Sequence, residues 1–207
     1  MSRWEPNARG RLLKAALELY GERGFEQTTV AEIARRAGLT ERTFFRHFAD
    51  KREVLFAGAG ALEDLLVSTV ANAPDCMTPI DAAAAGVEAA GAAIQEGQGR
   101  ELARLRQSII AASAELQERE LIKLASLASA LAGALRRRGV ADPAASLSAE
   151  AAIAVFRIAF DRWTTATDQQ DLPRLIRESL DALKAVTAGQ PPAEGHEQAS
   201  AAAALKR

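Results

Sequence analysis

The chain has almost no cysteine, since Cys76 is the only one among its 207 residues. No disulfide can form within the chain, which excludes a fold that depends on disulfides, as many small secreted domains do. Aromatic residues make up only 5% of the sequence and β-branched runs are scarce, whereas alanine, the best helix former, is abundant. These proportions predict an all-α fold, and the helix signals along the chain, given below, bring the expected number to about nine helices.

Long hydrophobic runs are also lacking. The longest uncharged stretch, Leu124–Leu135, is shorter than the roughly 18 residues that a membrane-spanning helix needs. The N-terminal sequence MSRWEPNARGR contains no apolar run of the kind found in signal peptides. We therefore expect a cytoplasmic protein without a membrane partner.

Groups that perform catalysis are equally sparse. The two histidines are His47 and His196, so neither a His-rich metal cluster nor a Cys/His nucleophile pair can be assembled. No HExxH, P-loop or glycine-rich dinucleotide motif accompanies the carboxylates. An enzyme is not expected, and neither is a metal or a cofactor.

Charge is distributed unevenly along the chain although the net charge is only −1. Residues 1–56 carry eleven Lys and Arg against eight Asp and Glu, whereas residues 57–207 carry fifteen against nineteen. A basic N-terminal part and an acidic remainder suggest that only the first part meets an anionic partner.

The N-terminal part contains closely spaced signals for helix ends. Periodic apolar residues predict a first helix over residues 8–23, ended by Gly24. Thr29 and Glu32 have the spacing of a capping box and predict a second helix that stops at Gly38, and Thr40 caps a short third helix. A second capping-box spacing at residues 50–53 predicts a long fourth helix toward Asn72, with Gly58 and Gly60 in its interior. Further helices are expected over about 78–97, 100–112, 115–138, 143–167 and 172–189.

The third helix is expected to have two chemically different faces. At 100° per residue, Phe44 and Phe48 share the core side, and Arg42 and Arg46 lie together on the opposite side. Two exposed arginines can be a merely solvated face. Two short helices joined through a glycine-containing turn are also the helix-turn-helix arrangement, whose second helix enters the DNA major groove, where arginine can bond guanine O6 and N7.

The segment AALELYGERGFEQTTVAEIARRAGLTERTFFRHFADKREVLF resembles the DNA-binding domain of TetR-family regulators. The resemblance implies base contacts by Arg42, Thr43 and Arg46 and phosphate contacts by Thr29, Lys51 and the Phe45–His47 region. Many members carry tyrosine where this chain has Phe45, which lacks the hydroxyl donor. Domains are expected at residues 1–56 for DNA binding and 57–189 for ligand binding and dimerisation, followed by a disordered tail at 190–207.

The expected body offers a dimer surface and a pocket. An apolar stripe over two helices predicts a four-helix bundle between two subunits, or alternatively the internal core of one body; it consists of Ile153, Phe156, Phe160, Trp163, Ile176, Leu180 and Leu183. The candidate pocket residues, each of which could equally be core, are Leu66, Leu105, Ile109, Leu124 and Leu127. The segment RELARLRQSIIAASAELQERELIKLASLASALAGALRRRG resembles mycofactocin-associated TetR members, which implies an acyl-thioester or other apolar effector.

Together these features predict a ligand-responsive transcriptional repressor. It would bind a palindromic double-stranded DNA operator as a homodimer and be released by a small apolar effector. The alternative that remains open is a transcriptional activator or a ligand-independent DNA-binding protein of the same fold.

Overall fold

The computed structural model describes residues 7–168 and 170–189, so the tail expected at 190–207 lies outside the described residues. Within these ranges the chain is built from helices without any strand, which confirms the all-α prediction. The elements are α1 (Ala8–Arg23), α2 (Val30–Arg36), α3 (Glu41–His47), the 3₁₀ helix η1 (Glu53–Phe56), α4 (Ala59–Ala71), α5 (Pro79–Ala111), α6 (Ala114–Arg137), α7 (Ala144–Thr165) and α8 (Leu172–Thr187).

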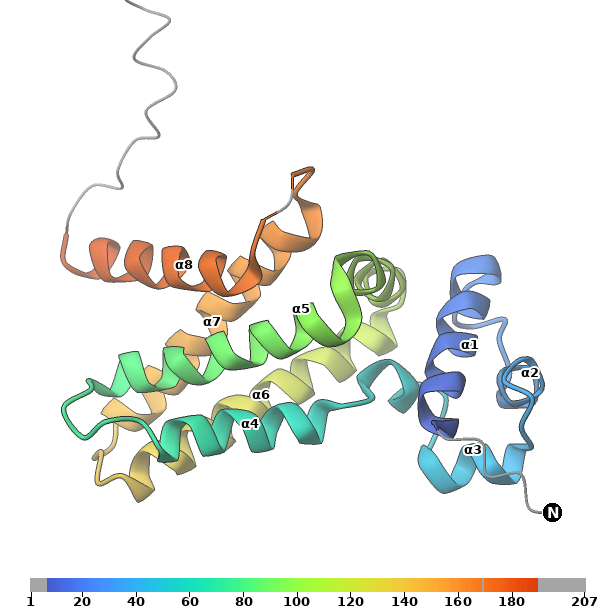
Figure 1. Cartoon of the computed structure of the whole chain (residues 1–207), viewed down its shortest axis with the longest axis horizontal. Coiled ribbons are helices and arrows are strands. Elements are labelled where there is room, and N and C mark those ends of the chain that lie inside the picture. Colours follow the sequence, from blue (N-terminus) through green and yellow to red (C-terminus); the bar gives the residue numbers. More distant parts are fainter. Residues whose placement is uncertain (1–6, 169, 190–207) are drawn as a thin grey trace, which may run out of the picture.

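The helices form two parts, which Figure 1 shows at opposite ends of the molecule. We call α1, α2 and α3 the head, and α4 to α8 the body. In the head α2 packs on both α1 and α3, and in the body α5 contacts each of the other four helices. η1 contacts α1 and connects the head to α4.

The helix ends of the head lie where the sequence predicts them. Thr29 and Glu32 form the complete capping box of α2, and the Thr40 hydroxyl accepts a hydrogen bond from the backbone N–H of Thr43 at 3.2 Å. The glycines that follow α1, α2 and α6 all have positive φ, as the sequence pattern requires.

The predicted long fourth helix is wrong, because two elements replace it. Asp50 accepts hydrogen bonds from the backbone N–H groups of Arg52 and Glu53, but only the single turn η1 follows. The Glu53 carboxylate does not complete the capping box; it binds Arg119 and Lys123 instead. Gly58 then has φ 96°, a left-handed conformation that interrupts the helix.

The two glycines of this connection should therefore respond oppositely to alanine. Gly58→Ala is expected to lower the free energy of unfolding by about 1–2 kcal/mol, because an L side chain is strained at positive φ. Gly60→Ala, within α4 and with open space around its Cα, is expected to raise it by up to about 1 kcal/mol. Denaturant unfolding of both variants tests this, and equal effects would contradict the observed break at Gly58.

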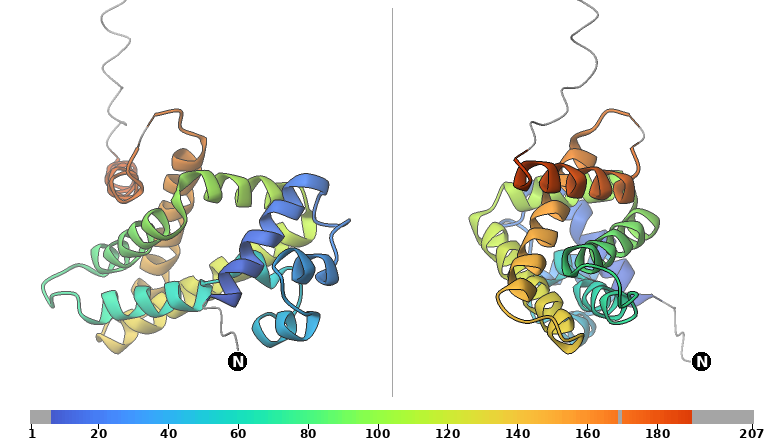
Figure 2. Two further views of the ribbon diagram at one scale, coloured as in Figure 1. Left: turned by 45° about the vertical axis from the view of Figure 1, so that its right-hand side comes forward. Right: turned by 90° about the vertical axis from the view of Figure 1, so that its left-hand side faces the viewer.

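Helix α5 changes direction within its length. Gly99 has φ 71° and ψ 164°, which are not helical values, and the two halves point in clearly different directions (Figure 2). The sequence predicts this division near Gly97. As a result the second half of α5 runs to α1, and its Ile109 and Ile110 are buried with Leu116 in the hydrophobic cluster of the head.

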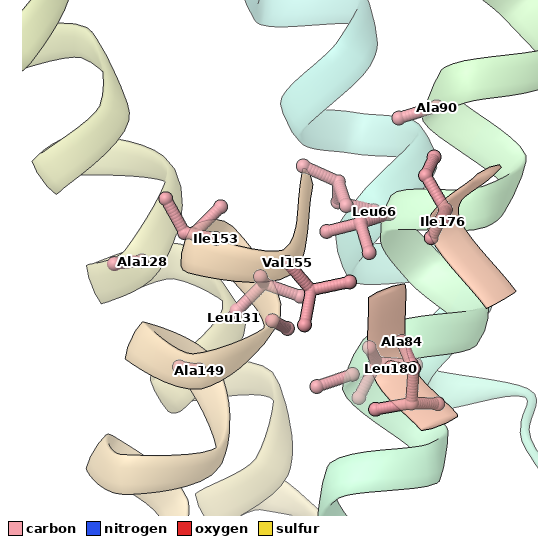
Figure 3. Packing of buried hydrophobic residues seen from close by; sticks show 14 of the residues in the cluster. Leu66, Ala84, Ala90, Ala128, Leu131, Ala149, Ile153, Val155, Ile176 and Leu180 are labelled. Atoms are coloured by element: carbon pink, nitrogen blue, oxygen red, sulfur yellow. The ribbon is translucent and has the colours of Figure 1, made fainter. Parts of the chain in front are cut away.

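The body core is rich in alanine, which lets its helices approach closely. A Cβ atom added to Gly91 of α5 would lie 2.6 Å from Ile176 Cδ1 of α8. Larger side chains fill the centre between α4, α5, α6, α7 and α8, as Figure 3 shows for Leu66, Leu131, Val155 and Ile176. The side chains of one chain therefore fill the core of the body.

One segment, Glu53–Ala71, is long and apolar enough to be a candidate membrane span by length and composition, with a mean hydropathy of 1.6. It consists of η1 and α4, separated by the break at Gly58, and α4 packs on α5 and α6. Glu53 at its start is ion-paired with α6. These features fit a helix of a packed body.

Candidate DNA interface and ligand cavity

The short helix α3 presents its two faces as the sequence predicts. Phe44 is fully buried and Phe48 is 5% exposed, so one side of α3 belongs to the head core. Arg42 and Arg46 are exposed on the other side, and within the described part of the chain no hydrogen bond or ion pair engages either guanidinium. Their donors are free to meet an external acceptor.

Three neighbours complete this outward surface. Phe45 is 55% exposed although it is a large apolar ring. Thr43 is half-buried, and its hydroxyl lies 3.1 Å from that of Thr40. His47 is half-buried, and its Nε2 is buried without a hydrogen-bond partner among the described residues. The surface therefore combines cations, one exposed ring and small polar groups.

The Lys51 ammonium is held by backbone carbonyl oxygens of the head. Its ammonium donates to the carbonyl oxygens of Phe25 at 2.9 Å, Glu26 at 3.3 Å and Thr28 at 3.1 Å, and it lies 4.3 Å from the centre of the Phe25 ring. An ammonium has three N–H donors, and all three are used here. In this structure Lys51 fastens the loop that leads into α2 and so positions Thr29, which is exposed at the helix start.

Tyr20 supports the same loop from α1. Its hydroxyl donates to the carbonyl oxygen of Lys51 at 2.7 Å, and its ring packs edge-on against Phe25. Burial raises the pKa of the Tyr20 phenol above its usual value, and the nearby Asp50 carboxylate adds to this. The phenol therefore stays a neutral donor, and it ties Lys51 and the Phe25 segment to α1.

The body contains a cavity of about 510 Å³ bounded by η1, α4, α5, α6 and α7. Three of the five predicted pocket residues, Leu66, Leu124 and Leu127, line it. Further apolar lining comes from Leu62, Ile94, Ile153, Phe156 and Phe160. A volume of this size is within the usual range of small-molecule sites.

The other two predicted pocket residues, Leu105 and Ile109, are not part of the lining. Both lie after the turn at Gly99 and pack against the hydrophobic cluster of the head. Leu105 Cδ1 is 3.4 Å from the position of a Cβ on Gly21 of α1. The prediction failed because periodicity marks an apolar face but does not say which part of the protein covers it.

The predicted dimer stripe is mostly internal. Trp163 and Ile176 are each 1% exposed, Ile153 is 5% and Leu180 is 9% exposed, all within the single chain. Leu183 packs on the same core, whereas Phe156 and Phe160 stack at 5.6 Å and line the cavity. Ile153, Trp163, Ile176 and Leu180 are therefore covered by their own chain, whereas Phe156, Phe160 and Leu183 remain partly exposed.

Three other apolar residues of these helices point outward. Leu147 and Ile158 of α7 are 65% and 58% exposed, and Val186 of α8 is 64% exposed. Sequence reasoning missed them because they stand outside the continuous stripe. Leu147 and Ile158 are eleven residues apart, which is three helical turns and places them on one face.

One end of the cavity is polar and adjoins the connection to the head. Arg106 Nε donates a hydrogen bond to the carbonyl oxygen of Leu55 at 2.7 Å. The guanidinium carbon of Arg106 lies 5.1 Å from the centre of the Phe56 ring, and its Nη1 is 3.4 Å from Glu120 Oε1. Burial lowers the pKa of Arg106, which the Glu120 carboxylate opposes. Since Leu55, Phe56 and Ala57 also line the cavity, the connection to the head forms part of its wall.

Arg100 and Arg104, the other two arginines in the second half of α5, hold another region. Arg100 donates to the carbonyl oxygen of Asp168, and Arg104 donates to those of Thr164 at 2.6 Å and Ala166 at 2.9 Å. Both fix the segment between α7 and α8. Of these three arginines only Arg106 lines the cavity.

A helix-turn-helix head with unpaired arginines on its second helix, joined to a helical body with a cavity, defines a DNA-binding transcriptional regulator. The chain belongs to the TetR family: residues 12–57 match the family model of bacterial regulatory proteins of the tetR type, and residues 77–188 match the MftR C-terminal domain. The resemblances noted for both segments are thereby confirmed.

Known relatives agree with this assignment. The transcriptional regulator TcmR of Streptomyces glaucescens is 33% identical over 90 residues, which are 44% of this chain and 40% of TcmR. The matched region thus spans less than half of that relative's length. Members and relatives of this kind are transcriptional regulators and not enzymes.

Solved structures share the fold. A triclosan complex of SmeT, an efflux-pump repressor of Stenotrophomonas maltophilia, has a TM-score of 0.61 at 24% identity and matches 87% of this chain and 90% of SmeT. FadR of Bacillus subtilis in complex with stearoyl-CoA has a TM-score of 0.59 at 19% identity and matches 84% of this chain and 96% of FadR. At these identities the likeness concerns the fold alone.

Proposed function

We propose that this protein is a ligand-responsive transcriptional repressor that binds a palindromic operator as a homodimer in the cytoplasm and is released by a small apolar effector. The observation that carries the proposal is the wall of the cavity: Leu55, Phe56 and Ala57 line it and belong to the connection that leads from α3 to α4. A ligand in the cavity would touch the segment on which the orientation of the head depends.

DNA recognition is assigned to the outward face of α3 and the start of α2. Arg42, Thr43 and Arg46 would contact base edges in the major groove, and Phe45 would contact a thymine methyl or a sugar. Thr29, His47 and Lys51 are assigned to phosphates. Lys51 would give up one of its three carbonyl oxygens for this, so we expect its contribution to be indirect, through the position of α2.

The homodimer is assigned to the outer faces of α7 and α8. Leu147, Ile158 and Val186 are the exposed large apolar residues of these helices. One recognition helix of seven residues contacts few base pairs, so two copies on a two-fold symmetric site would supply the discrimination that one lacks. The half-sites would lie about one helical turn or a multiple of it apart.

The effector is assigned to the cavity. Its lining is mainly apolar, and the charged side chains around it are Arg106, Lys123, Arg157 and Arg162 against Glu120 and Asp161. Three of these cations are ion-paired within the chain, Arg106 with Glu120, Lys123 with Glu53 and Arg162 with Glu178. The mainly apolar lining therefore suits an acyl thioester or another apolar compound. Bound triclosan in SmeT and stearoyl-CoA in FadR support an apolar ligand in a body of this fold.

DNA recognition is tested first by selecting the sequences that the protein binds from a random duplex pool. The enriched site is then used in a reporter assay. We expect a palindrome, and lower reporter expression when the protein is present. No enriched sequence would refute the operator, and increased expression would support an activator, the second candidate function.

Arg106 is expected to hold the connection to the head in place. Arg106→Met keeps an unbranched side chain but removes the charged donor to the Leu55 carbonyl, a bond worth about 1.5–3 kcal/mol. Amide hydrogens of residues 54–57 should therefore exchange roughly tenfold faster, or more, in hydrogen-exchange mass spectrometry. Arg104→Met is the matched control: it also loses bonds to backbone carbonyls, but exchange should rise near residues 164–170 and not at η1. Unchanged exchange at η1 in Arg106→Met would contradict this role.

A further inference from the structure

The cavity of the body opens at the surface of α7. Phe156 and Phe160 line it from the inside and are partly exposed. The lining also includes four exposed residues of α7, which we call the mouth of the cavity: Arg157, Ile158, Asp161 and Arg162. A single chain therefore leaves the apolar interior of the cavity in contact with water along this helix.

The outer face of α7 carries a short apolar seam beside the mouth. The seam consists of Leu147, Ala151, Ala154 and Ile158, whose spacing of four, three and four residues places them on one face of the helix. Leu147, Ala154 and Ile158 are exposed, and Ala151 is half-buried. Ile158 belongs to both the seam and the mouth, so a partner that covers the seam also reaches the mouth.

The charges beside the seam identify a second copy of this chain as that partner. Glu150 and Arg157 are seven residues apart, which is close to two helical turns, and both lie on the same side of the seam. Both are exposed, and within the described part of the chain no hydrogen bond or ion pair engages either charged group.

Two-fold symmetry brings these unpaired charges together. If α7 packs antiparallel on its copy, with Leu147 opposite Ile158 of the partner subunit, each Glu150 lies on the same side as Arg157 of the partner subunit. The two residues are then offset by about 3 Å along the helix axis, which both side chains can span. The pair forms twice, once on each chain. A parallel arrangement would instead put the two charges on opposite sides of the seam.

We infer that a second copy of the chain closes the mouth of the cavity, where its Glu150 pairs with Arg157, so that the effector site is complete only in the homodimer. This inference rests on the proposed function, which assigns the effector to the cavity and the dimer to the outer faces of α7 and α8. The dimer covers apolar ligand surface that the monomer leaves in water. Ligand binding and dimerisation therefore strengthen each other.

Charge reversal tests the position of the partner. Glu150 does not line the cavity, so Glu150→Arg can affect a ligand only through the second chain. In analytical ultracentrifugation its dimer dissociation constant should rise about tenfold or more, because two attractive pairs become repulsive. The double variant Glu150→Arg/Arg157→Glu should restore dimerisation. The control is Asp64→Arg, a reversal at an exposed position of α4, which should leave it unchanged.

The neutral apolar fluorophore N-phenyl-1-naphthylamine tests the closed site. Monomeric Glu150→Arg should bind it about tenfold more weakly than the wild-type dimer, the factor that corresponds to roughly 55 Å² of apolar probe surface left in water. The double variant should regain the wild-type affinity, and Asp64→Arg should keep it. Saturating probe should in turn lower the dimer dissociation constant of the wild type about a hundredfold, tenfold for each of the two sites.

Several results would overturn the inference. Unchanged dimerisation in Glu150→Arg, no rescue in the double variant, equal probe affinity of monomer and dimer, or no binding of the probe would each do so. The effect of the probe on wild-type dimerisation does not depend on the folding of any variant. DNA selection with the same preparation separates the two proposals. An enriched palindrome with equal probe affinities leaves the repressor intact, whereas no enriched sequence removes the proposed function itself.

Discussion

Replacing Trp163 by alanine should lower the free energy of unfolding by about 3–5 kcal/mol, the usual cost of removing a buried aromatic side chain. Its side chain is 1% exposed, its ring lies 5.8 Å from that of Phe160, and its Nε1 donates to the carbonyl oxygen of Gln170 at 3.1 Å. The variant therefore loses apolar packing and also leaves a carbonyl unpaired.

Denaturant unfolding at several protein concentrations measures this effect and tests the position of the residue. Because Trp163 packs within its own chain, the loss should not depend on protein concentration. Leu121→Ala is a suitable control, since Leu121 is 56% exposed on α6 and its replacement should change stability by no more than about 0.5 kcal/mol. If Trp163→Ala left the stability unchanged at high protein concentration and weakened only self-association, an interface position would be correct instead.

Removing either exposed arginine of α3 should weaken operator binding by about 1–3 kcal/mol, the contribution of one bidentate contact to a base. No interaction within the described residues engages Arg42 or Arg46, so Arg42→Ala and Arg46→Ala should leave the stability of the head unchanged. Each loss should be confined to particular base pairs in each half-site, because an arginine that reads guanine discriminates only there.

Titration of the selected duplex and of single-base variants, at two salt concentrations, measures both expectations. Arg137→Ala is the control, because Arg137 is exposed at the end of α6, in the body and outside the helices assigned to the dimer. Its affinity for DNA should equal that of the wild type. A loss that is the same for all sequences, together with a smaller salt dependence, would instead assign the arginines to phosphates.

The head shows how far local sequence signals reach. Caps, glycines and a 3.6-residue period act over a few residues, and they placed α1, α2 and α3 correctly and put Phe44 in the core opposite Arg42. They failed at Asp50–Glu53, where the capping spacing is present but the Glu53 carboxylate binds α6. Arg119 and Lys123, which are distant from Glu53 in the sequence, bind that carboxylate instead. A local sequence pattern does not contain this information.

The body shows what depends on tertiary contacts. The same apolar spacing describes Leu124, which lines the cavity, Leu105, which packs on the head, and Ile176, which is core. The Lys51 side chain is long enough to reach a phosphate. In the folded head the loop before α2 surrounds its ammonium, which donates to three carbonyl oxygens.

The sequence by itself determined the all-α class, the helix ends of the head and the outward arginines, because these follow from forces within one turn or one helix. Only the tertiary structure decided which apolar faces are covered by their own chain and which enclose a cavity. It also decided that Arg106 joins that cavity to the connection with the head. Which faces are covered depends on which helices pack together. The turn at Gly99, for example, directs the second half of α5 to α1.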